Sequence, residues 1–191
     1  PTRLFFAPTA RSVPRGGGYA ALYEGLLPFV QVGITDRFSI GAGTPLIFGG
    51  GETHPVWVTP KLQVFDHGDT QAAVGAMHFL NVDSASFGIA YGVVTKGSSD
   101  GAVTVGIGLP YYRNNGYKGG DAVVMIGGER RLSPKIKLIS ENYIMREVGF
   151  VSAGVRLFGE QFSTDFAMVA PFSSGGFVAF PMVNFVWKFG Q

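Results

Sequence analysis

The clearest alternation of hydrophobic and polar positions lies at the end of the chain, in residues 166–191. This stretch carries no charge before Lys188, yet Pro171 and Pro181 would interrupt a transmembrane helix. Read with a period of two, residues 177–189 separate into two faces. The first face carries Phe177, Ala179, Val183, Phe185, Trp187 and Phe189, and the second carries Phe180, Met182, Asn184 and Lys188. The pattern therefore predicts a strand that contacts an apolar medium on one side.

Turn residues recur along the whole chain and divide it into segments of strand length. We interpret these segments as twelve strands of one antiparallel meander. The predicted strands are residues 2–9, 19–34, 38–48, 55–65, 70–82, 86–95, 102–113, 121–132, 135–146, 149–159, 162–172 and 176–189. Strands of about ten residues suit a tilted crossing of a bilayer. The predicted fold class is therefore all-β, an antiparallel up-and-down transmembrane β-barrel that forms a single domain over residues 1–191. Ten strands is the alternative, because the first segment is short and residues 135–159 can be divided differently.

An even number of strands places both chain ends on one side of the membrane, the periplasmic side in barrels of this kind. Residues 10–18, 49–54 and 114–120 would then belong to outer loops. In residues 102–113, Val103, Val105, Ile107, Leu109 and Tyr111 are predicted to face lipid. In residues 86–95, Phe87, Ile89, Tyr91 and Val93 alternate with small residues that we expect to face inward. Tyr111, Tyr112, Tyr143, Trp57 and Trp187 lie near predicted strand ends, where an interfacial girdle of aromatic residues is expected.

Composition agrees with a barrel and excludes some kinds of site. The chain is 46% hydrophobic and 15% charged, with 29 Gly and 17 Phe, which favours strands and tight turns over helices. The net charge of +2, with no basic run, gives no reason to expect nucleic acid as a partner. The absence of cysteine excludes disulfides and thiolate metal sites. No signal peptide is visible at Pro1, so we expect a mature or trimmed chain.

Several charged residues fall on the inward face of neighbouring predicted strands. If Glu160 and Gln161 form a turn, antiparallel pairing sets Arg156 opposite Asp165. A four-residue bend at 147–150 would also bring Glu141 opposite Arg156. The same face carries Lys137 and, with a matching turn, Glu129 and Arg131. We therefore predict a charge cluster in the lumen that consists of Glu129, Arg131, Glu141, Arg156 and Asp165. These charges either fill and rigidify the lumen through ion pairs or form a constriction that selects permeants by sign.

The three histidines are the natural candidates for catalysis or metal binding. His54 and His67 lie in connections on opposite sides of the predicted membrane, so they cannot form one site. His78 is the only strand histidine, and its parity places it toward lipid, opposite Tyr91. No nucleophile and orienting group can be assigned beside it, so we expect no catalytic residue, no metal site and no cofactor.

Several short segments carry a resemblance to a known family. The strand-turn-strand unit Val32–Gly43, VGITDRFSIGAG, resembles one that is common in outer-membrane barrel proteins of Gram-negative bacteria. The segments RLFFAPTA at Arg3–Ala10, SENY at Ser140–Tyr143 and GVRLFGE at Gly154–Glu160 are similar to one such family of uncharacterised barrels. The resemblance implies an outer-membrane β-barrel and supplies no activity or functional residues.

Three functional hypotheses follow. The first is an outer-membrane barrel with a structural or partner-binding role and no enzymatic activity, in contact with lipid and with other membrane or cell-surface proteins. The second is a porin-like passive pore for small polar solutes. The third is a lipid-active outer-membrane enzyme that would use His78.

Overall fold

A computed structural model describes residues 2–46, 55–82, 85–113, 117–172 and 178–190. Within these residues the chain forms fourteen strand segments in one antiparallel sheet. The segments are β1 (Gly18–Tyr23), β2 (Leu27–Gly33), β3 (Phe38–Gly43), β4 (Val56–Val58), β5 (Lys61–His67), β6 (Thr70–Val82), β7 (Ala85–Gly97), β8 (Gly101–Arg113), β9 (Tyr117–Gly119), β10 (Val123–Ser133), β11 (Ile136–Ile144), β12 (Gly149–Phe158), β13 (Phe162–Phe172) and β14 (Phe180–Phe189). No helix long and apolar enough to cross a membrane occurs in this part of the chain.

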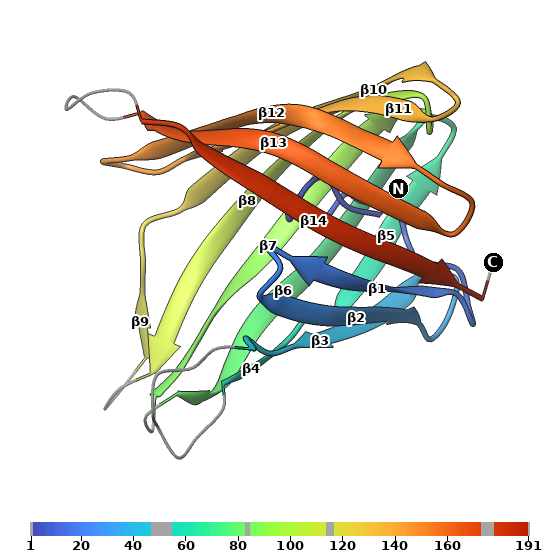
Figure 1. Ribbon diagram of the computed structural model, residues 1–191. Helices are drawn as coiled ribbons and strands as arrows, with labels where there is room; N and C mark the ends of the chain where they lie inside the picture. The colour runs from blue at the N-terminus through green and yellow to red at the C-terminus, as the bar shows by residue number, and fades with distance from the viewer. Residues whose placement is uncertain (1, 47–54, 83–84, 114–116, 173–177, 191) are drawn as a thin grey trace.

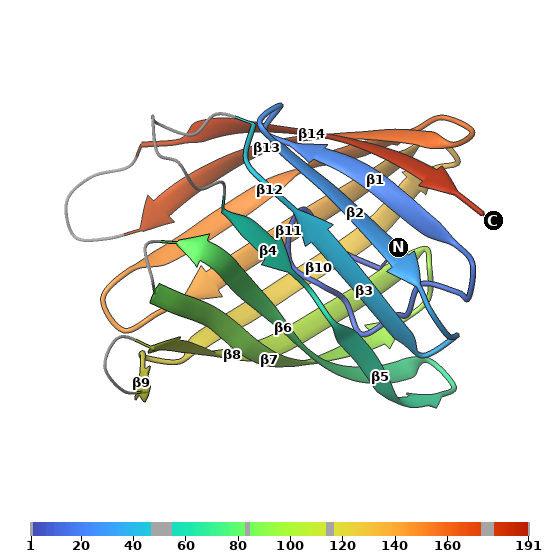
Figure 2. The same cartoon turned by 90° about the horizontal axis from the view of Figure 1, so that it is seen from below.

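The sheet closes into a barrel because its first and last strands pair. β1 pairs with β14 from Gly18 opposite Phe189 to Tyr23 opposite Asn184. β4 and β5 lie one after the other between β3 and β6, and β9 and β10 both pair with β8, so each couple occupies one position in the wall. The result is a twelve-stranded antiparallel barrel, as predicted (Figures 1 and 2).

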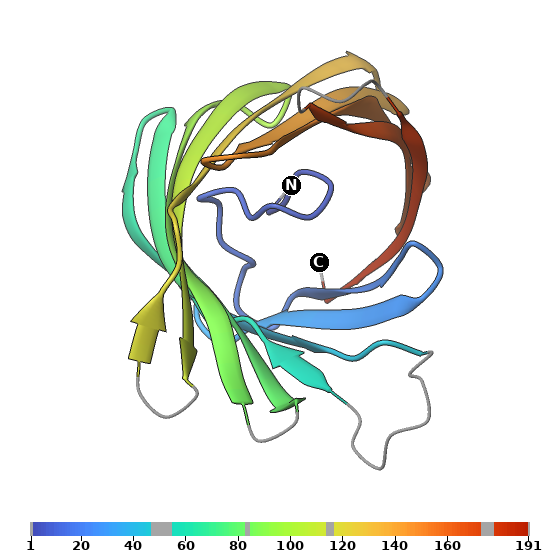
Figure 3. The ribbon, with the colours of Figure 1, turned by 90° about the vertical axis from the view of Figure 1, so that its left-hand side faces the viewer.

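Two of the predicted strands are nevertheless wrong. Residues 2–9 are not part of the wall: the chain from residue 2 to residue 13 lies inside the barrel (Figure 3), and we call it the lumen segment. Residues 14–17 lead from it to β1 at the rim, where Gly16 and Gly17 form backbone hydrogen bonds with Gly33 of β2. Residues 19–34 are not one strand but the β1–β2 hairpin. Glu24 and Gly25 turn the chain there with φ angles of 53° and 68°, and Leu26 donates a backbone hydrogen bond to Tyr23. The two errors cancel, so the strand number stays at twelve.

The two ends of the barrel differ in their connections. The end that holds Gly18 and Phe189, here the terminal end, has the short turns 34–37, 68–69, 98–100, 134–135 and 159–161. The opposite end, here the far end, has the turns 24–26 and 145–148, and the described residues 44–46, 55 and 120–122 also lie there. Residues 10–18, predicted as an outer loop, are therefore misplaced: they belong to the lumen segment, its connection to β1 and the start of β1. Of the predicted outer connections, 49–54 lies outside the described residues, and so does the part 114–116 of the other. Residues 117–120 are described and lie at the far end.

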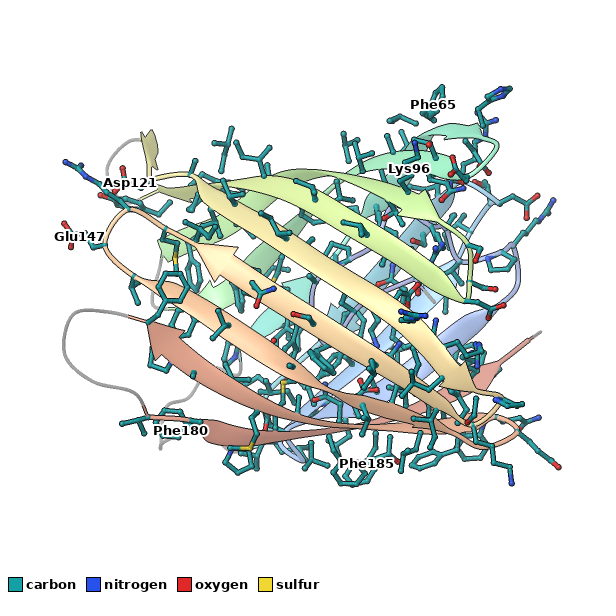
Figure 4. All side chains as sticks on the ribbon, turned by 90° about the horizontal axis from the view of Figure 1, so that it is seen from above. Phe65, Lys96, Asp121, Glu147, Phe180 and Phe185 are labelled. Carbon is teal, nitrogen blue, oxygen red and sulfur yellow. The ribbon has the colours of Figure 1, made fainter. Side chains whose placement is uncertain are left out.

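The outer surface of the wall is apolar along the length of the strands. In β8, Val103, Val105, Ile107 and Leu109 are exposed and Thr104 is buried, so the predicted faces of this strand are confirmed. The outward Phe185 and Trp187 and the inward Asn184 likewise confirm the alternation of β14. Figure 4 shows Phe65 and Phe185 on the outside of the barrel, while the charged Asp121, Glu147 and Lys96 lie near its two ends.

The faces predicted for β7 are reversed in the structure. Val93 is buried and Tyr91 packs against the interior cluster, whereas Val94 and Ala90 are exposed. The inside of this part of the barrel is itself aromatic and apolar, so both faces of β7 are hydrophobic. The period of two then identifies the faces without showing which one points outward. Because the interior also accepts aromatic side chains, two members of the expected aromatic girdle, Trp57 and Tyr143, pack inside the barrel.

Candidate functional site

The lumen segment begins as a compact hairpin in the middle of the barrel. Arg3 forms a bridge with Pro8, Leu4 donates a backbone hydrogen bond to Ala7, and Thr9 donates one to Thr2. The side chains of Leu4 and Phe5 are fully buried. They pack in a cluster with wall residues from several strands: Ala73, Val93, Met125, Ile139, Ala167 and Met182. Residues 2–9, whose sequence pattern resembles that of a lipid-facing strand, therefore form a plug that makes its own hydrophobic contacts inside the barrel.

Glu141 of β11 holds the tip of this hairpin. Its Oε2 accepts hydrogen bonds from the backbone N–H groups of Phe5, Phe6 and Ala7 at 2.8, 3.0 and 3.1 Å. Its Oε1 accepts one from the Tyr143 hydroxyl at 2.7 Å. Three successive N–H groups directed at one oxygen form an anion-binding nest. The carboxylate is buried, and these donors replace the water that it loses.

A second contact joins Arg156 of β12, Asp165 of β13 and Arg3. Arg156 and Asp165 are direct partners in the register, and Nη2 of Arg156 lies 3.0 Å from Oδ2 of Asp165. Nη1 of Arg3 lies 2.9 Å from the same Oδ2. Arg156 also donates to the carbonyl oxygens of Arg3 and Leu4. One wall carboxylate is therefore shared by a wall arginine and a plug arginine, all three of them buried.

The later part of the lumen segment is bound to β5 and β7. The Lys61 ammonium donates to the carbonyl oxygens of Thr2, Thr9 and Arg11 at 3.3, 3.2 and 2.7 Å. Gln63 donates to the carbonyl of Ala10, whose N–H donates to the Thr95 hydroxyl at 2.9 Å. These partners are backbone groups, so the wall recognises the path of the segment as well as its side chains.

Glu129 of β10 makes a third contact near the terminal end. It pairs with the fully buried Lys137 of β11 at 3.0 Å and with Arg11 of the lumen segment. Arg11 also donates to the carbonyl of Ser98 at 2.6 Å, and Lys137 donates to the carbonyl of Ser99 at 2.7 Å. The ion pairs thus join the plug to β10, and the hydrogen bonds of Arg11 and Lys137 join this contact to the turn between β7 and β8.

The predicted charge cluster is therefore divided into separate contacts. Arg156 stands opposite Asp165, as its register predicted, but Glu141 does not stand opposite Arg156. Lys137 takes that place, because the turn from Met145 to Val148 is centred two residues before the predicted bend. Arg131 lies at the rim, where it pairs with the exposed Asp100 at 2.7 Å. The prediction missed the partners from the lumen segment, because residues 2–9 were assigned to the wall and residues 10–18 to an outer loop.

The histidines lie away from these contacts. His67 is exposed at the end of β5, and His54 lies outside the described residues. His78 shares the outward parity of Val74 and Leu80, and its Nδ1 lies 2.9 Å from the Tyr111 hydroxyl. Tyr91, its predicted neighbour, instead faces inward and pairs with Gly75. No group of three or more potential metal ligands occurs in the described ranges of the chain.

Between the plug and the far end, the lumen contains a cavity of about 480 Å³. Arg3, Phe6 and Pro8 of the lumen segment form one side of it. Its other walls come from β1, β2 and β4 to β7, and include Tyr23, Phe29, Trp57, Phe79, Phe87 and Tyr91. Plug and cavity together are the candidate functional site.

Comparisons with known proteins bear on the fold. No protein-family model matches the sequence, and no curated protein matches it. Among solved structures, the chain is similar to a KdgM porin in complex with disordered oligogalacturonate. The superposition has a TM-score of 0.67 and covers 91% of this chain and 98% of the porin chain, at 7% sequence identity. The likeness therefore concerns the porin-like architecture of the barrel.

Proposed function

We propose that the protein is a channel for small polar solutes in the outer membrane of Gram-negative bacteria, and that the lumen segment holds it closed. The observation that carries this proposal is the set of wall side chains bonded to the backbone of residues 2–11 inside a closed barrel. The porin-like fold favours a channel over the structural or partner-binding role that the sequence alone puts first. Contact with other membrane or cell-surface proteins stays a prediction.

The outer surface supports a place in a membrane. The exposed side chains of the strands are mostly Val, Leu, Ile and Phe, and they continue around the wall. A monomeric protein in water rarely exposes an apolar surface that extends so far. The same surface would suit the hydrocarbon of a bilayer, with charged residues such as Lys96 and Glu147 near the two ends (Figure 4).

The groups behind the plug support passage of polar solutes. Where the lumen segment contacts the wall, the wall presents Lys61, Gln63, Glu141, Arg156 and Asp165. If the segment left the lumen, these groups would be solvated and would line a polar path. Loss of the hydrogen bonds and ion pairs with the segment would then cost little free energy, because water would replace these partners.

Conductance in a planar bilayer tests the closure. We expect the full chain to give no steady current. A variant in which residues 2–11 are replaced by ten Gly and Ser residues keeps the chain length but loses Leu4, Phe5 and Arg3, and it should give steady open currents. Both proteins must first show the heat-modifiable mobility of a folded barrel. Steady current from the full chain would contradict closure by the segment, and a folded variant without current would contradict the channel.

The opened variant also allows a test of the charged constriction. In it, Arg156 and Asp165 face each other across neighbouring strands without Arg3. Arg156→Ala removes a positive charge and should shift the reversal potential toward cation selectivity. Asp165→Asn should shift it in the opposite direction, and Arg131→Ala at the rim should have a smaller effect. Equal shifts for Arg156→Ala and Arg131→Ala, or shifts of one sign for both inner variants, would contradict selection at this row.

A further inference from the structure

The cavity beside the plug has a shape set by aromatic side chains that lie flat on the wall. Phe79 stacks on Phe87 with ring centroids 4.6 Å apart, and Trp57 lies 6.1 Å from Phe79. A Cβ atom at Gly43 would come within 2.3 Å of the Trp57 ring, and one at Gly75 within 2.4 Å of the Tyr91 hydroxyl. These glycines let the rings lie against neighbouring strands, which leaves the space in front of the rings empty.

The lining of the cavity is mostly apolar, although the contacts between the plug and the wall beside it are polar. Aromatic rings, Met77, Leu27 and several prolines supply most of it. Water in such a space would have few hydrogen-bond partners, and each square ångström of apolar surface removed from water contributes about 25 cal/mol. A volume of about 480 Å³ lies in the range of pockets that hold small organic molecules. The cavity therefore favours a ligand with an apolar body over a hydrated solute.

The charged groups at the cavity determine the sign of the ligand. Among the described residues that line it, the charged ones are Arg3 and Lys61, and neither Asp nor Glu is among them. The three ammonium hydrogens of Lys61 are matched by three backbone carbonyls. The hydrogen bonds described for Arg3 all leave from Nη1, and its guanidinium carbon lies 5.3 Å from the centroid of the Tyr23 ring. Arg3 pairs with Asp165 through Nη1, and Asp165 is shared with Arg156, so the three side chains together keep one net positive charge. Arg3 is the one of the three that lines the cavity, so it is the cation that can meet an anionic group.

We propose that this cavity binds a small aromatic monocarboxylate. The aromatic body of the ligand lies against Trp57, Phe79 and Phe87, and its carboxylate pairs with Arg3 at the plug. Offset stacking and edge contacts between rings add to the burial of apolar area. Pairing of a carboxylate with a guanidinium is charge-assisted and geometrically specific. The inference goes beyond the channel, because binding does not require that the plug move or that current flow.

Fluorescence of Trp57 tests the site directly. The chain has two tryptophans, and Trp187 is 59% exposed on the outside. The full chain with Trp187→Phe, in lipid vesicles, leaves Trp57 as the reporter, and 4-iodobenzoate serves as a heavy-atom quencher. We expect saturable quenching, with 4-iodobenzyl alcohol binding about tenfold more weakly because it lacks the charge. The matched protein with Trp57→Phe, whose remaining Trp187 faces lipid, measures partition of the probe into the bilayer.

Two variants separate the head and the body of the ligand. Arg3→Gln should lower the affinity for 4-iodobenzoate about tenfold and leave the affinity for the alcohol nearly unchanged. Phe87→Ala, which removes a ring that stacks on Phe79 and leaves Arg3 in place, should weaken both probes. Linear quenching of equal slope in the Trp57 and Trp187 proteins would overturn the site. Equal affinities for carboxylate and alcohol would overturn the anionic ligand, whatever the conductance of the channel.

Discussion

Glu141 shows at the scale of one residue how the wall holds the plug. A carboxylate inside a protein is costly unless donors replace its lost water. Here the donors are three backbone N–H groups that only the folded hairpin of residues 5–7 brings together. The same contact thus satisfies a buried charge and fixes the position of Phe5. Tyr143, two residues away on β11, completes the set of donors.

Glu141→Gln should therefore loosen the tip of the plug. The amide keeps the size of the side chain but loses the charge, and hydrogen bonds to charged groups are worth about 1.5–3 kcal/mol in proteins. We expect hydrogen exchange of the amides of Phe5, Phe6 and Ala7 to become at least about tenfold faster, since about 1.4 kcal/mol corresponds to a factor of ten. Hydrogen-exchange mass spectrometry of the N-terminal peptide measures this.

Glu147→Gln is the matched control, because Glu147 is exposed in the turn between β11 and β12. It makes the same chemical change without a contact to the plug, so exchange of the N-terminal peptide should not change. If the Glu141 variant behaves like this control, the carboxylate does not hold the segment.

At the scale of the strand, local patterns predicted most of the wall. Residues 70–82 and 162–172 coincide with β6 and β13. The turn at Glu160 and Gln161 was enough to set Arg156 opposite Asp165, because a tight turn fixes the register of its hairpin. The register of β11 on β12 was four residues away from the prediction. A shift by an even number keeps each side chain on its face, so Glu141 still points inward.

The parts that could not be predicted depend on contacts between distant residues. Residues 2–9 have the apolar composition of a strand, and only the cluster with Met125, Ile139 and Met182 makes them a plug. The turn at Glu24 and Gly25 was missed because Glu-Gly is a weaker turn signal than Asn-Gly or Asp-Gly. The orientation of β7 and the presence of the cavity could not be predicted for the same reason: the interior of the barrel is aromatic here and its exterior is apolar. Periodicity within a strand does not carry the information that separates the two.

At the scale of the whole molecule, the apolar outer surface and the polar plug contacts form two concentric layers. The ion pairs among Arg3, Arg156 and Asp165 and those around Glu129 lie in the interior of the barrel. Apolar residues of the same strands, such as Ile126, Val151 and Phe166, point outward. A protein folded for water would have the opposite order. The arrangement implies that the surrounding medium is apolar over the middle of the strands and polar at their ends.

This implication predicts that the cost of a charge on the outer surface depends on its height along the barrel. Ile107 is 52% exposed at the middle of β8, and Leu132 is 57% exposed near the terminal end of β10. In a bilayer, Ile107→Arg should lower the free energy of unfolding by about 2–4 kcal/mol and Leu132→Arg by about 0–1 kcal/mol. Denaturant titrations of both variants in lipid vesicles measure the difference. In water, surface substitutions of this kind usually change stability by about 0.5 kcal/mol or less. Equal and small costs at the two positions would therefore mean that hydrocarbon does not surround the barrel, and the outer-membrane proposal would have to be abandoned.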